Sequence, residues 1–250
     1  EPFNGEQRVK ADAVGDETYG VLKLNLMEDF PTGVYEYNLM TSVFVATEPA
    51  NGLPAGSPTK VSFSSQEWCG HVWQQAEFNR PRRGRPGVRQ TVHSYFEGQA
   101  DPNDFMDHPA GGIAEEALML WARGLAGPRL GAGESIEVSV LRAMSVQRLL
   151  HREAAWVEAT LTRSGETSSV EAAGETFAAE LFTADVEGRR YEFVVATDRP
   201  ARPLLELRRS DGYTLTLTGV ERMPYWRMQS NADEASVSDF GLQRRGPGRM

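Results

Sequence analysis

The sequence predicts a mainly β protein: an antiparallel meander that forms a curved sheet, an open barrel or two packed sheets, with one short helix around residues 112–125. Apolar and polar residues alternate along several segments, as they do in strands with one buried face. Glycine- and proline-rich turns separate these segments at short intervals. A single segment has apolar residues at helical spacing, and we expect this helix to plug an end of the barrel or to cover a sheet edge.

Four strands are predicted in the first half of the chain. Leu22, Leu24 and Leu26 alternate with polar residues, which indicates a half-buried strand. A second alternating stretch follows a turn, and a third, rich in Val, Phe and Trp, follows a Gly/Pro loop. An Arg/Pro/Gly turn then leads into the fourth. The predicted strands span residues 19–26, 35–45, 60–78 and 88–97.

The helix is predicted from its apolar periodicity and its charged ends. Acidic residues lie in its first turn and Arg123 in its last, as the helix dipole prefers. Gly and Pro residues follow, and we expect residues 127–133 to form a linker. The apolar residues at helical spacing are Ile113, Ala117, Leu120, Trp121 and Leu125.

Two hairpin turns are predicted in the second half, where alternation resumes after Ser135. Glu187-Gly188 suits a two-residue turn between strands. The residues 210–212 suit a three-residue loop with the glycine in the left-handed conformation. This loop pairs Leu207 with Leu215, which keeps the leucines of both strands on one side of the sheet.

The sequence predicts that the chain has three parts: an entry segment, a β-rich domain and a tail. Residues 1–16 carry few apolar anchors and predict a loose entry segment. Residues 17–228 predict one β-rich domain, which the linker divides into halves at 17–126 and 134–228. Residues 229–250 predict a polar tail.

Composition excludes several classes of protein. The chain has 250 residues, of which 40% are apolar, and a formal charge of −9, so it is neither disordered nor suited to nucleic-acid binding. No apolar run is long enough to span a bilayer as a helix. The single cysteine excludes an internal disulfide framework. The chain begins with Glu1 instead of Met, and we expect that a segment was removed ahead of it.

One segment carries residues with catalytic or binding chemistry. If residues 60–78 form one strand, its alternate side chains point the same way. A hairpin near Arg83-Gly84 with an even register then places Trp73 opposite His93 on the next strand, and the whole set on one face. The residues of this predicted face are Glu67, Cys69, His71, Trp73, His93, Tyr95 and Glu97.

The residues of this predicted face could serve one of three functions. Cys69 could act as a nucleophile with His71 or His93 as its base. The imidazoles with Glu67 or Glu97 could hold a metal ion. The remaining function is a polar lining for an apolar or amphiphilic ligand, with Glu67, Trp73, Tyr95 and Glu97 as its contacts. The alternative that we favour is structural: a small buried thiol and a hydrogen-bonded imidazole on a Trp-rich strand.

Two other clusters are weaker candidates. The segment 101–108 holds three aspartates and His108, which could bind a divalent cation, but its spacing matches no calcium loop and favours a solvated loop. A basic turn could touch an anionic membrane surface, although a soluble hairpin tip is the favoured interpretation. Its residues are Arg80, Arg82, Arg83, Arg85 and Arg89. A smaller group of arginines lies in the tail, at Arg244, Arg245 and Arg249.

The stretch 24–41 and the motif Ser64-Ser65-Gln66-Glu67-Trp68-Cys69-Gly70-His71 resemble a group of uncharacterised bacterial proteins, sometimes labelled septum formation inhibitor Maf. The second half, with Leu204-Leu205-Glu206-Leu207, Asp211-Gly212 and Met223-Pro224-Tyr225-Trp226, resembles exported bacterial β-domain proteins of unknown function. The Maf label does not fit, because Maf nucleotide pyrophosphatases are α/β proteins that open with a Ser-Pro-Arg-Arg motif. The resemblance implies an exported antiparallel β fold and no activity.

We therefore expect a non-enzymatic β protein of the periplasm or cell envelope that binds an amphiphilic ligand or a protein partner. The absence of G-x-S-x-G, H-E-x-x-H and P-loop motifs supports this expectation. A hydrolase or metal-binding protein that uses Cys69, His71 and His93 is the alternative, and an assembly subunit is a third. No cofactor is expected.

Overall fold

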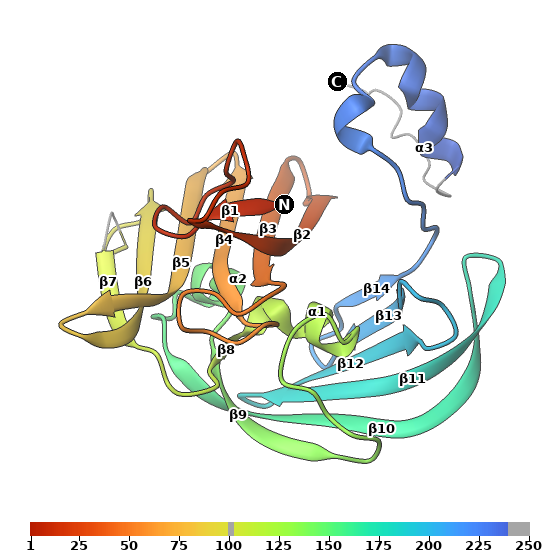
Figure 1. Ribbon diagram of the computed structural model, residues 1–250. Coiled ribbons are helices and arrows are strands. Elements are labelled where there is room, and N and C mark those ends of the chain that lie inside the picture. The colour runs from red at the N-terminus through yellow and green to blue at the C-terminus, as the bar shows by residue number, and fades with distance from the viewer. Residues whose placement is uncertain (100–102, 240–250) are drawn as a thin grey trace. The chain divides into compact units, whose positions relative to one another are not determined.

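The computed structural model describes residues 1–99 and 103–239 and confirms a mainly β fold with a few short helices. The first sheet contains seven strands, each paired antiparallel with the next along the chain (Figure 1). In order, they are β1 (Pro2–Asn4), β2 (Thr18–Pro31), β3 (Glu36–Ala46), β4 (Pro58–Glu67), β5 (Gly70–Arg82), β6 (Arg85–Ser94) and β7 (Asn103–Asp107).

The second sheet also contains seven strands, again ordered as they follow in the chain. Its first pair is parallel, and the last three pairs are antiparallel. The strands are β8 (Ile113–Ala114), β9 (Ser135–Leu141), β10 (Trp156–Ala172), β11 (Glu175–Val186), β12 (Arg189–Ala196), β13 (Leu204–Arg209) and β14 (Thr214–Thr216).

The helices are short. The predicted helix around 112–125 is present as a 3₁₀ turn followed by α1, and a second helix, α2, was not predicted. The helical segments are η1 (Glu115–Ala117), α1 (Leu118–Ala122), α2 (Met144–Leu150), η2 (Tyr225–Arg227), η3 (Asn231–Ala235) and α3 (Ser236–Asp239). The predicted polar tail lies partly outside the described residues.

The chain divides into two compact units. The first contains residues 1–129 and 136–161, and the second contains residues 130–135 and those from 162 on. The division after Arg129 falls inside the predicted linker 127–133.

In the first unit, one face of the first sheet is buried under the helices. Helix α2 packs on β4, η1 packs on β3, and β8 also contacts β4. We call this the inner face. Its alternate residues include Val43, Val61, Phe63, Val72 and Ala76, each at most 2% exposed. Burial of this apolar surface supplies the main driving force for folding of the unit.

The opposite, outer face is covered at one end by the entry segment. Residues 1–16 differ from the loose segment that their composition suggests, because β1 pairs with β2 and Phe3 is 2% exposed. The Phe3 ring packs on Phe44, with ring centroids 4.8 Å apart, and edge-on to Tyr19. Phe3 therefore anchors a segment in which the other large apolar residues, Val9 and Val14, are exposed.

The prediction of one strand over residues 60–78 is wrong. Glu67 pairs with Gly70, so Trp68 and Cys69 form a two-residue turn between β4 and β5. The inner face therefore takes odd-numbered residues of β4, such as Phe63, but even-numbered residues of β5, such as Val72. This change of parity in the apolar pattern is the sequence signal for the turn.

The other hairpin predictions are confirmed. Residues 187–188 connect β11 and β12, and residues 83–84 connect β5 and β6, each as a two-residue loop. Gly212 has a φ of +94° in the loop between β13 and β14, and Leu207 pairs with Leu215 as expected.

A bulge changes the register between β5 and β6. Arg82 pairs with Arg85 at the turn, but beyond Phe78 and Asn79 the pairing shifts by one residue. Asn79 has a φ of +54°, a left-handed conformation that asparagine tolerates better than most residues. The bulge sets which side chains of β5 and β6 share a face.

The second unit has its own small core and an ion pair whose carboxylate is buried. Phe177, Ala179, Ala196 and Leu205 form the buried apolar cluster. Nearby, Arg163 donates two hydrogen bonds of 2.8 and 3.0 Å to the Glu180 carboxylate. The same guanidinium donates to the Leu130 carbonyl at 3.0 Å, which ties residues 130–135 to this unit.

Two carboxylates cap the N-terminus of α2 in the first unit. Glu115 accepts the Ala143 N–H at 2.8 Å, and Glu116 accepts the Met144 N–H at 2.7 Å. Both acceptors complement the helix dipole. Burial nevertheless raises the pKa of Glu116 to about 7, because the charged form loses its hydration.

We predict that Glu116→Gln stabilises the protein at pH 8 and not at pH 4. The folded protein binds the Glu116 proton more tightly than the unfolded chain, so wild-type stability falls as pH rises from about 4 to about 7. Glutamine keeps an acceptor for the Met144 N–H and does not titrate. Urea unfolding should give a gain of about 1 to 3 kcal/mol at pH 8. An equal gain at both pH values, or in the exposed control Glu137→Gln, would contradict the prediction.

Candidate functional site

The predicted pairing of Trp73 with His93 is confirmed. The two residues face each other across β5 and β6, and their rings stack with centroids 5.5 Å apart. Met27, Met40 and Ser64 continue the same cross-strand row on the outer face of the sheet. His93 is exposed there, on the side of the sheet opposite α2.

His71 and Tyr95 lie at the end of this ladder. The last pair of β5 and β6 is Val72 with Ser94, one residue short of the predicted His71–Tyr95 pair. The Tyr95 ring packs against the backbone of Gly70, where a Cβ atom would lie 2.3 Å from the ring. Gly70 is thus required for packing of an aromatic ring on the strand.

The prediction that Glu67, Cys69 and His71 point the same way is wrong. Glu67 belongs to β4, on the inner face, and its side chain is 2% exposed beside Arg148 at 3.5 Å. Cys69 lies in the exposed turn, and its N–H donates to Glu67 Oε2 at 2.5 Å. The turn at 68–69 reverses the alternation on which the predicted common face depended.

The surroundings of Cys69 disfavour its action as a nucleophile. A hydrogen bond to the Glu67 carboxylate, together with its negative charge, raises the pKa of the Cys69 thiol. Catalytic cysteines have the opposite environment, in which positive charge lowers the thiol pKa.

The described part of the aspartate-rich segment, residues 103–108, does not converge on a metal site. The His108 ring stacks on Trp156 at 5.4 Å, and its Nε2 contacts the Gly112 carbonyl at 3.1 Å. Burial lowers the pKa of His108. Asp101 and Pro102 lie outside the described residues. Within residues 1–99 and 103–239, no three His, Cys, Asp or Glu side chains gather closely enough to hold a metal ion.

The arginine-rich turn is partly engaged within the protein. Arg80 and Arg89 both bind the Glu77 carboxylate, whose side chain is 3% exposed. The Arg82 guanidinium lies over the Phe105 ring, 5.2 Å from its centroid. Arg83 and Arg85 are exposed at the hairpin tip. The tail arginines Arg244, Arg245 and Arg249 lie outside the described residues.

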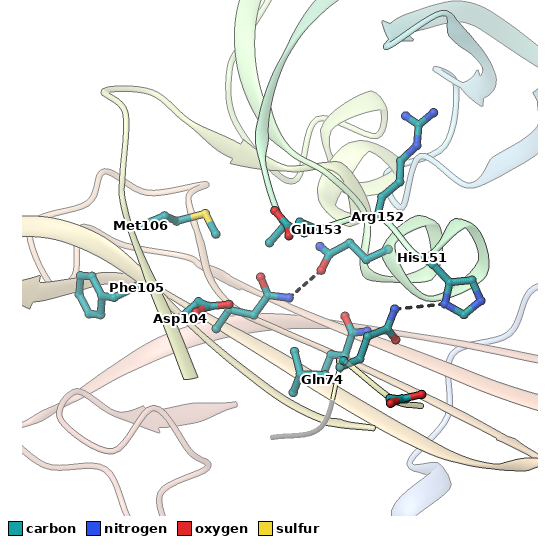
Figure 2. A pocket seen from close by; sticks show the side chains of 14 residues that line it. Gln74, Asp104, Phe105, Met106, His151, Arg152 and Glu153 are labelled. Atoms are coloured by element: carbon teal, nitrogen blue, oxygen red, sulfur yellow. Dashed lines mark hydrogen bonds between the residues drawn. The ribbon is translucent and has the colours of Figure 1, made fainter. Parts of the chain in front are cut away.

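A pocket of about 690 Å³ lies within the first unit (Figure 2). Strands β5, β6 and β7 contribute to its wall, as do α2 and the segments that follow β6 and α2. Three buried glutamines line it: Gln74 on β5, Gln90 on β6 and Gln147 on α2, at 4%, 3% and 5% exposure. We call it the glutamine pocket.

Two of the glutamines, Gln90 and Gln147, form a directed chain of hydrogen bonds. Gln147 Nε2 donates to the Arg142 carbonyl at 2.7 Å, and Gln147 Oε1 accepts from Gln90 Nε2 at 2.7 Å. The carbonyl oxygens of Gln74 and Gln90 are both buried, and neither has a hydrogen-bond partner in the described part of the chain. Both oxygens are closed off from solvent by the surrounding protein, so their unmet hydrogen bonds are a cost of packing this wall.

Charged and apolar residues complete the lining. Glu97, Asp104 and Glu153 supply carboxylates. Val92, Met106 and Ala154 supply apolar surface. Gln99 Nε2 bonds His151 Nδ1 at 3.1 Å and joins the segment after β6 to the segment after α2 (Figure 2).

Of the candidate residues predicted from the sequence, Glu97 of the predicted face and Asp104 of the aspartate-rich segment line this pocket. Trp73, His71 and His93 face the other side of the sheet. Sequence reasoning missed the glutamines, although the signal was present. Gln74 and Gln90 occupy positions of β5 and β6 where their strands otherwise place buried apolar residues such as Val72, Ala76 and Val88.

No family model, curated protein or solved structure matches the chain. The resemblance of the chain to exported bacterial β-domain proteins therefore stays a prediction. Among the described residues, no helix combines the length and the apolar character of a membrane span.

We predict that Glu67→Gln accelerates alkylation of Cys69 and that Arg148→Met does not. Both substitutions break the Glu67–Arg148 pair, but the first alone removes the carboxylate that raises the thiol pKa. Iodoacetamide labelling at pH 8, followed by mass spectrometry, should show a several-fold faster reaction for Glu67→Gln. Equal rates in wild type and Glu67→Gln would show that the carboxylate does not control the thiol.

Proposed function

We propose that this protein is a non-enzymatic binding protein of the cell envelope that holds an amphiphilic small molecule in the glutamine pocket. The observation that carries the proposal is a pocket of about 690 Å³ in the first unit, lined by buried glutamines, carboxylates and apolar side chains. A ligand group that donates hydrogen bonds could be bound there by the carboxylates of Glu97, Asp104 and Glu153.

The pocket has the size and mixed lining of a ligand site. Its volume of about 690 Å³ lies within the usual range of small-molecule pockets, about 300 to 1,000 Å³. Val92, Met106 and Ala154 offer apolar contact for a hydrocarbon portion, and the glutamines offer polar contact. This combination favours a molecule with one polar end and one apolar end.

An exposed aromatic edge favours self-association as a second candidate function. Tyr35 stacks on Trp68 at 5.8 Å, and Tyr37 stacks on Phe30 at 5.4 Å, where the β2–β3 and β4–β5 hairpins turn. Trp68 is 76% exposed, and exposed aromatic residues are enriched in protein interfaces. If this edge joins copies of the chain, sedimentation should show concentration-dependent association that Trp68→Ser reduces. A monomer at all concentrations would exclude this candidate.

Membrane contact is a further proposal for the exposed hairpin tip. Arg83 and Arg85 extend a positive charge toward solvent, which suits anionic lipid headgroups. Binding to vesicles of mixed zwitterionic and anionic lipid, and its loss in the Arg83→Ser/Arg85→Ser double variant, would support this contact.

We predict that Ala154→Trp abolishes ligand-induced stabilisation. The indole would occupy the pocket beside Val92 and Met106. The protein is screened by thermal unfolding against single-chain amphiphiles with positive, neutral and negative headgroups. A ligand present at about 100 times its Kd should stabilise the wild type by about 2.7 kcal/mol and leave Ala154→Trp unchanged.

The matched control is Ala155→Trp, which adds the same side chain at the next position, outside the pocket lining. This variant should respond to the ligand as the wild type does. The proposal fails if no headgroup class stabilises the wild type. It also fails if Ala154→Trp responds as strongly as Ala155→Trp.

A further inference from the structure

The outer face of the first sheet carries an uninterrupted row of uncharged polar side chains. Successive cross-strand pairs from β2 to β7 place one member of the row on each strand. The members are Asn25, Ser42, Ser62, Gln75, Thr91 and Asn103. Each has a hydroxyl group or a side-chain amide, and none is charged, although 24% of the residues in the chain are charged. We call this the amide–hydroxyl row.

A second uncharged row lies beside the first, two residues away on each strand. It contains Met27, Met40, Ser64, Trp73 and His93. Met27, Met40 and His93 are exposed, so no described element covers this part of the outer face. The two rows together form a broad, uncharged surface that is open to solvent.

The indole of Trp73 gives this surface an aromatic contact. His93 stacks on one side of it, with ring centroids 5.5 Å apart and ring planes 27° apart. The other cross-strand neighbour of Trp73 is Ser64, whose side chain is too small to cover the indole, and Trp73 is only half-buried. The electron-rich face of an aromatic ring attracts polarised C–H bonds, such as those on the face of a sugar ring.

Two hydrogen bonds within the amide–hydroxyl row fix the polar atoms that it presents. Ser42 Oγ donates to Asn25 Oδ1 at 2.7 Å, and Thr91 Oγ1 donates to Asn103 Oδ1 at 2.9 Å. The side-chain nitrogens of both asparagines then remain as donors, and the two hydroxyl oxygens remain as acceptors. A ligand that matches this row must both donate and accept hydrogen bonds, as the hydroxyl groups of a sugar do.

The composition of the two rows disfavours other macromolecules as ligands. Nucleic acids and anionic membranes are bound mainly through Lys and Arg, and neither row contains them. Protein interfaces are depleted of serine, whereas the rows include Ser42, Ser62 and Ser64. An uncharged ligand rich in hydroxyl groups is the class that remains.

We propose that the outer face of β2–β7 binds an uncharged, extended glycan chain, of the kind that β-1,4-linked sugars form. Neighbouring strands lie about 4.8 Å apart, so the amide–hydroxyl row spans about 24 Å from β2 to β7. A sugar unit in an extended chain is close in length to one strand spacing, so a hexasaccharide matches the row. This face is opposite the glutamine pocket, and the inference does not depend on the proposed function.

The experiment is isothermal titration of the full chain with three uncharged hexasaccharides. Cellohexaose and N-acetylated chitohexaose are extended, whereas maltohexaose joins the same glucose units as cellohexaose into a coiled chain. We expect at least one extended chain to bind, and maltohexaose to bind at least about tenfold more weakly, because a coiled chain must be straightened to follow the row. Affinity should be the same at low and high salt, because no ion pair is formed.

Substitutions then assign the binding to the proposed surface. Trp73→Ala should weaken binding about tenfold, and Trp73→Tyr, which keeps an aromatic face, should weaken it less. The control Trp226→Ala removes an indole that is 60% exposed in the second unit and should leave binding unchanged. Gln75→Ala removes one amide from the row and should weaken binding several-fold. Its control, Gln7→Ala, removes an exposed amide outside the row and should have no effect.

Three outcomes would overturn the inference. The first is that neither extended hexasaccharide binds, or that maltohexaose binds as tightly as the extended chains. The second is that Trp73→Ala and Gln75→Ala, each shown to be folded by circular dichroism, bind as the wild type does. The third is a dimer in sedimentation that Trp73→Ala dissociates, which would assign this face to a second copy of the chain.

Discussion

The register between β5 and β6 is the constraint on which the arrangement of the first unit depends. The two-residue turn at Arg83-Gly84, continued without interruption, would pair Gln74 with His93 and place Gln90 on the opposite face from Gln74. The bulge at Phe78 and Asn79 shifts the pairing by one residue, so that Trp73 meets His93 instead. Both glutamines then face α2, and the imidazole faces the other side. One extra residue thus separates the polar pocket from the aromatic outer row.

Polar contacts at both ends of α2 hold the helix over the inner face of the first sheet. The helix spans seven residues, which is too short to be stable alone. Glu115 and Glu116 accept its first N–H groups, and Arg148 in its last turn approaches Glu67 at 3.5 Å while its guanidinium lies over the Phe96 ring. Glu67 in turn accepts the N–H of Cys69, so the tip of the β4–β5 hairpin and the helix are joined through one buried carboxylate. These contacts are what place Gln147 within reach of Gln90.

Local sequence patterns were sufficient for much of the fold. The turns at 187–188 and 210–212, and the pairing of Leu207 with Leu215, follow from glycine conformation and strand alternation, which are properties of a few neighbouring residues. The turn at Trp68-Cys69 lacks a glycine or asparagine at its centre and was missed. The pocket was missed for another reason: Gln147 is 57 residues from Gln90, and no short-range pattern encodes their contact. A polar residue at a core position of a strand was the one available clue.

The contact between Glu67 and the exposed cysteine has a chemical consequence for the durability of the protein. Two copies of a chain with one accessible thiol can become cross-linked through a disulfide, and that reaction begins from the thiolate. Because the Glu67 carboxylate raises the pKa of the Cys69 thiol, it lowers the fraction of thiolate from which this oxidation begins. The same buried carboxylate that joins the hairpin to the helix therefore also disfavours disulfide cross-linking of two copies through Cys69.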